Sequence, residues 1–209
     1  MTTHEENVLM TRTGPGTPGG DMMRRYWLPV ALSDELPQGG APMPITILSE
    51  NLVLFRDEAG KPGLLQRLCP HRCADLSFGR IEDGGLRCLY HGWLFDTAGN
   101  CTEQPGEPPE STYKDEVKAR AYPLVEKGGM IFAWLGTGTA TEFPDWEFLN
   151  AAPEHRFLLR TVIECNYMQA VEGNIDPVHL SYLHRPLKQV DSRPVPGSEK
   201  SADHFYAAE

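Results

Sequence analysis

Short runs of apolar residues separated by turn residues fill the stretch between residues 45 and 135. The apolar runs lie at residues 52–55, 64–68, 86–90, 93–95 and 130–135. The segments at 57–60 and 98–100 contain Asp, Gly and Asn, which favour tight turns. This alternation predicts a domain of short antiparallel β-strands.

The pattern changes to helical spacing after residue 163. Apolar side chains recur on one face of a predicted helix, at Tyr167, Met168 and Val171. Gly173 is a typical helix end, and Asp176 followed by Pro177 is typical of a helix start. We therefore expect two consecutive helices, the second running to about residue 184.

These two patterns predict an α+β fold class. The expected organisation is a lead-in segment at residues 1–36, an antiparallel all-β domain at 37–138, and the helical start of a second domain at 139–209.

Composition narrows the range of functions. The chain has 209 residues, 40% of them hydrophobic and 23% charged, which is typical of a folded globular protein. A net charge of −10 argues against nucleic acid and anionic membranes as partners, because both require clustered Lys and Arg. The sequence contains no apolar stretch of about 20 residues and no recognisable signal peptide, so we expect a cytoplasmic protein.

Four of the Cys and His residues form a metal-binding pattern. Cys69-Pro70-His71 is followed by sixteen residues and then by Cys88-Leu89-Tyr90-His91. Two thiolates can hold one iron of a [2Fe–2S] cluster, and two imidazoles the other. A Cys2His2 zinc site uses the same donors, but it usually pairs Cys with Cys and His with His. The mixed halves favour the cluster.

A second group of candidate ligands lies on the predicted second helix. Asp176 and His179 are three residues apart and share a helix face. His184 lies about 140° further around an ideal helix, so it converges with His179 only if the helix ends or bends there. Two His and a carboxylate are typical of non-haem Fe(II) sites. Taken alone, the spacing favours ordinary helix residues with Asp176 as a simple cap.

Both motifs resemble those of the Rieske non-haem iron oxygenases. Residues 69–72, Cys-Pro-His-Arg, and residues 88–96, Cys-Leu-Tyr-His-Gly-Trp-Leu-Phe-Asp, are similar to the two cluster loops of that family. Residues 164–184 resemble its iron-binding helix region, and residues 14–18 and 24–31 look most like the phthalate dioxygenase branch. The resemblance implies the N-terminal half of an oxygenase (alpha-type) subunit. The second domain would be an incomplete α/β, helix-grip-like catalytic domain.

The resemblance also implies roles for individual residues. His71 and His91 would hold the outer iron of the cluster, and His179 and His184 a mononuclear iron. Asp176 would carry electrons between subunits by bridging His179 and a cluster histidine of the neighbouring subunit, His91 by position.

Several other polar residues remain without an assigned role in the metal sites. The third iron ligand of the family is a carboxylate far downstream, so the resemblance implies that it would not be in this chain. No motif surrounds the remaining acidic residues Asp191, Glu199, Asp203 and Glu209. Glu172 is a weaker candidate than Asp176 for the bridge. The remaining cysteines, Cys73, Cys101 and Cys165, are interpreted as bystanders.

The predicted function is that of the oxygenase component of a Rieske mononuclear iron oxygenase. It would hydroxylate or O-demethylate an aromatic compound, an aromatic carboxylate by analogy with the phthalate branch, using O2 and electrons from an NAD(P)H-dependent reductase or a ferredoxin. A homotrimer or a multiple of it is implied. Two alternatives remain open, a Rieske ferredoxin that only transfers electrons and a zinc-stabilised interaction module.

Overall fold

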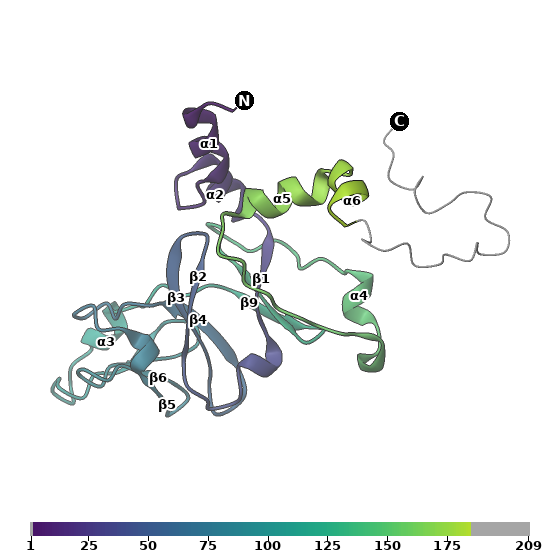
Figure 1. Ribbon diagram of the computed structural model, residues 1–209. Helices are drawn as coiled ribbons and strands as arrows, with labels where there is room; N and C mark the ends of the chain where they lie inside the picture. Colours follow the sequence, from purple (N-terminus) through teal and green to yellow (C-terminus); the bar gives the residue numbers. More distant parts are fainter. Residues whose placement is uncertain (1, 185–209) are drawn as a thin grey trace. The chain divides into compact units, whose positions relative to one another are not determined.

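The computed structural model describes residues 2–184 (Figure 1). Contacts divide the chain into two compact units, residues 1–161 and 162–209. The first unit contains three antiparallel sheets, and the described part of the second contains two helices. The α+β class is therefore confirmed. The predicted domain boundaries at 36/37 and 138/139 stay a prediction.

The central sheet of the first unit has the strand order β2–β3–β4. These strands are β2 (Met43–Ile47), β3 (Glu50–Arg56) and β4 (Pro62–Gln66). The turn between β2 and β3 places Leu48 and Ser49 at φ +46° and +64°, the left-handed pair that matches the twist of a tight hairpin. The apolar run of β3 thereby pairs with both neighbours along its length.

Both faces of β3 and β4 are buried, which explains why their apolar residues run without interruption. One face contributes Leu52, Leu54 and Leu64 to a core shared with the sheet of β1 (Trp27–Leu32), β10 (Met130–Trp134) and β9 (Leu124–Lys127). The other face contributes Val53, Phe55 and Leu65 to a core that also contains Cys69 and Cys88. That second core supports the candidate cluster loops.

The remaining strands form two further sheets. One has the order β1 (Trp27–Leu32), β10 (Met130–Trp134), β9 (Leu124–Lys127). The other has the order β5 (Arg80–Glu82), β6 (Gly85–Arg87), β7 (Leu94–Phe95), β8 (Cys101–Glu103). The prediction of a strand at 86–90 is wrong beyond Arg87, because residues 88–91 turn away to form a loop.

Short helices connect and flank the sheets of the first unit. The α-helices are α1 (His4–Thr11), α2 (Pro18–Met23), α3 (Tyr113–Glu116) and α4 (Glu147–Asn150). Three single 3-10 turns lie at Ser33–Glu35, Leu76–Phe78 and Pro153–His155.

A buried ion pair ties the N-terminal segment to the central sheet. Arg24, which follows α2, donates to the Glu50 carboxylate (2.9 Å) and to the carbonyl oxygens of Thr13 and Leu48 (2.8 and 2.9 Å). Tyr122 donates to the other Glu50 oxygen (2.6 Å). Because each charge is paired and hydrogen-bonded, the desolvation cost of burying Arg24 and Glu50 is offset.

The second unit contains the two consecutive helices, α5 (Tyr167–Ile175) and α6 (Val178–Tyr182). The expected helix end at Gly173 is wrong, since α5 continues to Ile175 with Asp176 as its C-cap. Asp176 nevertheless supports the start of α6, because its Oδ1 accepts the Val178 amide (2.8 Å). No helix within residues 2–184 is long and apolar enough to cross a membrane.

Candidate metal centre

The four candidate cluster ligands lie on two loops that share one backbone pattern. In each loop the cysteine amide donates to the carbonyl five residues later, and the cysteine carbonyl accepts from the amide four residues later. The bonds are Cys69 N to Ala74 O (2.8 Å), Cys73 N to Cys69 O (2.9 Å), Cys88 N to Trp93 O (2.8 Å) and Gly92 N to Cys88 O (3.1 Å). Each loop is closed at its base, and its histidine lies at the tip.

The fifth residue of each loop has a left-handed backbone. Cys73 has φ +55° and Gly92 has φ +74°. Glycine adopts this conformation freely, whereas a residue with a side chain is strained there by about 1–2 kcal/mol. Cys73 therefore occupies the position at which the second loop uses glycine, and its exposed side chain lies outside the buried thiol pair.

The two thiols of Cys69 and Cys88 are buried and adjacent. Their residues are 1% and 3% exposed. Burial, together with the neighbouring Cys88, raises the pKa of the Cys69 thiol to about 12. Two adjacent buried thiols release their protons only when a cation compensates the charge, and iron in a cluster supplies that compensation.

The two imidazoles lie beside each other nearer the surface. The ring centroids of His71 and His91 are 4.6 Å apart. The His71 ring stacks parallel to Trp93 at 4.3 Å, and the His91 ring packs against Tyr90 at 3.8 Å. Desolvation, His91 and Arg72 all lower the pKa of His71. A neutral imidazole has the free lone pair that a metal requires.

This donor set fits a [2Fe–2S] cluster better than a single metal ion. Within residues 2–184 no three His, Cys, Asp or Glu side chains converge on one ion position. A zinc site would require such convergence, whereas each iron of this cluster type takes only two protein ligands. Two buried thiols and two outer imidazoles match that division.

The arginines next to the loops were not recognised from the sequence. Arg67 forms an ion pair with Asp75 (2.7 Å), and the other Asp75 oxygen accepts the Ser77 amide. Arg87 donates to the Gly92 carbonyl (2.8 Å) inside the second loop. Arg67 lies two residues before Cys69, and Arg87 lies one residue before Cys88. This closeness to the cluster cysteines was the signal available in the sequence.

The second group of candidate ligands comes together within the second unit. The rings of His179 and His184 have centroids 5.4 Å apart. Asp176 Oδ2 lies 3.5 Å from His179 Nδ1. Among the residues that the structure describes, no further carboxylate completes a three-ligand site. Glu172 interacts with Gln169 (3.4 Å). The acidic residues at 191, 199, 203 and 209 lie outside the described residues.

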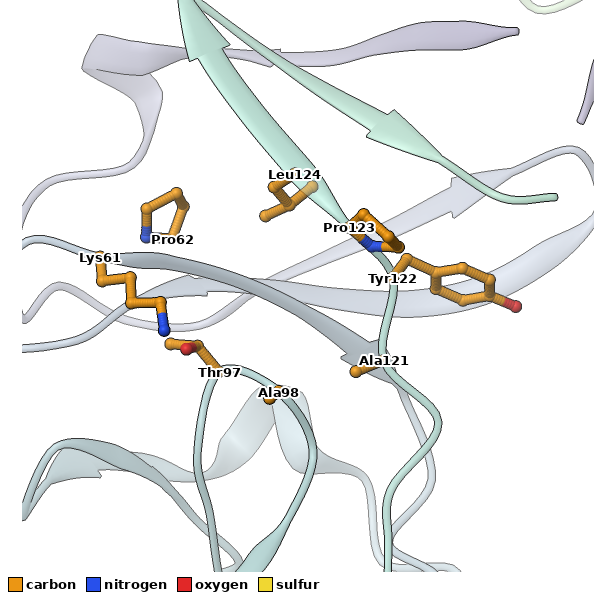
Figure 2. Close-up of a pocket in the computed structure, with 8 residues that line it drawn as sticks. All are labelled: Lys61, Pro62, Thr97, Ala98, Ala121, Tyr122, Pro123 and Leu124. Atoms are coloured by element: carbon orange, nitrogen blue, oxygen red, sulfur yellow. The ribbon is translucent and has the colours of Figure 1, made fainter. Parts of the chain in front are cut away.

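The first unit also contains a cavity of about 390 Å³ away from these ligands. Its lining includes Lys61, Thr97, Tyr122 and Leu124 (Figure 2). None of the candidate metal ligands lines it, so we assign it no part in the metal chemistry.

Comparisons with known proteins agree with the fold and the motifs. Residues 26–123 match the Rieske [2Fe-2S] domain. This stretch contains Cys69, His71, Cys88 and His91. The chain therefore contains a Rieske domain, the class of domain that carries a [2Fe–2S] cluster.

Similar proteins extend the relationship beyond this domain. The chain is 43% identical over 187 residues to the 5,5'-dehydrodivanillate O-demethylase oxygenase subunit of Sphingobium sp., covering 88% of this chain and 44% of that protein. It is 44% identical over 183 residues to a tert-butanol monooxygenase / tert-amyl alcohol desaturase oxygenase subunit of Aquincola tertiaricarbonis, covering 87% of this chain and 38% of that protein. It is 43% identical over 190 residues to the phthalate 4,5-dioxygenase oxygenase subunit of Pseudomonas putida (88% and 42%).

A solved structure is also similar. Dicamba monooxygenase bound to dicamba matches with a TM-score of 0.64 and 33% identity, covering 78% of this chain and 48% of that one. Beyond the Rieske domain, the chain is similar to Rieske oxygenase subunits of the phthalate and demethylase type. It spans less than half the length of each of these relatives.

Proposed function

We propose that Cys69, His71, Cys88 and His91 bind a Rieske [2Fe–2S] cluster, with the thiolates on the inner iron and the imidazoles on the outer one. The adjacent buried thiols and the adjacent imidazoles carry this proposal. When bound, the cluster supplies one-electron transfer at a potential above that of all-cysteine clusters.

The protein positions the His71 ring and leaves His91 accessible to an electron donor. The parallel stack with Trp93 fixes the plane of the His71 ring and covers one of its faces. His91 is exposed and therefore offers the route by which an electron enters or leaves. A reductase or ferredoxin that draws electrons from NAD(P)H would be the donor.

We further propose that the chain is part of the oxygenase component of a Rieske mononuclear iron oxygenase. His179 and His184 would hold the mononuclear iron, with a carboxylate as the third ligand. Their adjacent rings and the polar contact between Asp176 and His179 support this assignment. Asp176 orients His179 and would link it to His91 of a neighbouring subunit. That link requires a homotrimer or a multiple of it.

The reaction we propose is hydroxylation or O-demethylation of an aromatic compound by O2, in the cytoplasm. An aromatic carboxylate is the substrate class suggested by the phthalate branch. The relatives with nearly equal identity carry out demethylation, dioxygenation and tert-butanol oxidation, so identity alone does not separate these reactions. We expect the chain to consist of a lead-in segment (1–36), a Rieske domain (37–138) and the start of a catalytic domain (139–209).

The alternative is a Rieske ferredoxin that only transfers electrons. It accounts for the cluster loops but leaves the Asp176, His179 and His184 arrangement without a role. We therefore propose to replace His179 with Ala in the full-length protein, with His155→Ala as a control at an exposed histidine outside both motifs.

The oxygenase proposal predicts that His179→Ala abolishes substrate oxidation and leaves the visible spectrum of the cluster unchanged. His155→Ala should retain both. Unchanged oxidation in His179→Ala would contradict the proposal and favour the ferredoxin.

A further inference from the structure

Arg87 stands out as a buried cation at the base of the second cluster loop. It is the last residue of β6, its side chain is only 9% exposed, and the next residue is Cys88. A buried guanidinium is costly unless its donors are paired, so its partners indicate what it does.

The partners of Arg87 are of two kinds. Three carboxylates pair with Nε and Nη2, those of Glu82, Asp83 (2.7 Å) and Glu103 (2.6 Å). The remaining nitrogen, Nη1, donates to the carbonyl oxygen of Gly92 (2.8 Å). Arg87 therefore connects the β5–β6 hairpin and β8 to the loop that carries Cys88 and His91.

The contact with Gly92 controls the part of the loop that follows His91. Gly92 has a left-handed backbone, and its amide closes the loop on the Cys88 carbonyl. A hydrogen bond from a fixed cation to this peptide restrains its rotation, since charge-assisted bonds are stronger than neutral ones. Because Gly92 directly follows His91, holding the Gly92 carbonyl in place also restrains the His91 backbone and therefore the orientation of its ring.

The first cluster loop lacks an equivalent contact from its own arginine. The Arg67 guanidinium pairs with Asp75, beyond the end of that loop. The first loop also has Trp93 stacked on its histidine, whereas among the described residues the rings packed on His91 are those of His71 and the exposed Tyr90. The loop that carries His91 therefore depends on the restraint that Arg87 provides at its base.

We propose that Arg87 is a positioning residue that fixes the second cluster loop, and through it the orientation of His91, by its bond to the Gly92 carbonyl. The carboxylates of Glu82, Asp83 and Glu103 hold the guanidinium in place for this task. This inference rests on the proposed cluster, but the restraint on the loop exists in the protein chain itself and can be measured separately.

The test replaces Arg87 with Lys, which keeps the charge but lacks the planar fork that reaches the carboxylates and the carbonyl together. The matched control is Arg80→Lys. Arg80 lies opposite Arg87 in the β5–β6 register and is 60% exposed. Among the described residues it pairs with Glu82 alone, the one carboxylate that it shares with Arg87. A second variant, Glu103→Gln, loosens one anchor of Arg87 without changing Arg87 itself.

The first readout is hydrogen exchange of the Cys88 and Gly92 amides in the purified protein, with the buried β3 amide of Leu54 as the internal reference. We expect at least tenfold faster exchange in Arg87→Lys, a smaller increase in Glu103→Gln, and no change in Arg80→Lys. Unchanged exchange in Arg87→Lys would overturn the restraint, whatever the metal content.

The second readout is the electron paramagnetic resonance spectrum and midpoint potential of the reduced cluster. Both should shift in Arg87→Lys and stay unchanged in Arg80→Lys, because ligand orientation tunes a metal centre. Faster exchange without any spectral or potential change would overturn the positioning role. Absence of iron and sulfide from the wild-type protein would instead refute the proposed cluster, and the exchange result would still stand.

Discussion

The ion pair between Arg67 and Asp75 gives a quantitative prediction for the first cluster loop. Arg67 Nε donates to Asp75 Oδ2 (2.8 Å), while Asp75 Oδ1 caps the short turn at Ser77 (2.9 Å). Replacing Asp75 with Asn keeps an oxygen for the Ser77 amide but removes the charge. The substitution therefore isolates the ion pair from the cap.

The size of the effect follows from the pKa of Asp75. The bond from Arg67 is the largest cause that lowers the Asp75 pKa, and with the hydrogen bonds from Ser77 it lowers this pKa from 3.8 to about 2, against the opposing effect of burial. A difference of this size corresponds to about 2 kcal/mol. Because the Arg67 and Asp75 side chains remain 32% and 24% exposed, we expect about 1 kcal/mol after solvent screening.

The sign of the pH dependence is fixed by the direction of this change. The folded-state pKa lies below the unfolded one, so the stabilisation is complete above the unfolded value of 3.8 and is lost as the pH falls through about 2. The Asp75→Asn variant should therefore be less stable than wild type near neutral pH. The difference should fall to about half near pH 3.

Urea unfolding under anaerobic, reducing conditions measures this difference, provided that both proteins show the same dependence on urea concentration. Asp96→Asn is the control, because Asp96 also caps a turn through its Oδ1 but forms no ion pair with Arg or Lys among the described residues. A difference that stays constant from neutral pH to about pH 3 would refute the reasoning.

Three further predictions follow from the fold. Gly99→Ala should cost at least about 2 kcal/mol of unfolding free energy, because at φ +83° a Cβ there would lie 2.1 Å from a carbonyl oxygen. The control Gly16→Ala, at φ +79° with no atom within 4 Å of the added Cβ, should cost about 1 kcal/mol. Equal losses of stability in chemical denaturation would contradict this prediction. Tyr122→Phe should lower the free energy of unfolding by about 1–2 kcal/mol at neutral pH, because it removes the hydrogen bond to Glu50. Burial raises the Tyr122 pKa to about 12, so wild type should lose this extra stability only in strong alkali. A variant as stable as wild type in urea would be evidence against the buried network. Asp176→Ala should expose the Val178 amide to faster hydrogen exchange, by about fivefold or more, since the capping oxygen is lost; unchanged exchange would argue against this cap.

The sequence predicted the features that depend on local spacing. The apolar run at 52–55 gave a buried strand, and the paired Cys and His residues gave two loops that bring them together. The strand expected at 86–90 was too long because Leu89 and Tyr90 are apolar yet exposed at the loop tip. Apolar character alone does not distinguish such a tip from a strand.

Two features were missed for different reasons. The role of Arg87 depends partly on Glu103, sixteen positions later, and no local pattern reveals that partner. The end of α5 was misplaced because Gly173 has a helical backbone and open space around it, and nothing there stops the helix. Glycine permits a helix end but does not require one.

The most direct test of the account is the content of iron, acid-labile sulfide and zinc in protein purified without oxygen. The account predicts two sulfides per chain, with two irons for the cluster and a third where the mononuclear site is filled. Zinc without sulfide would contradict the assignment of Cys69, His71, Cys88 and His91 to a [2Fe–2S] cluster.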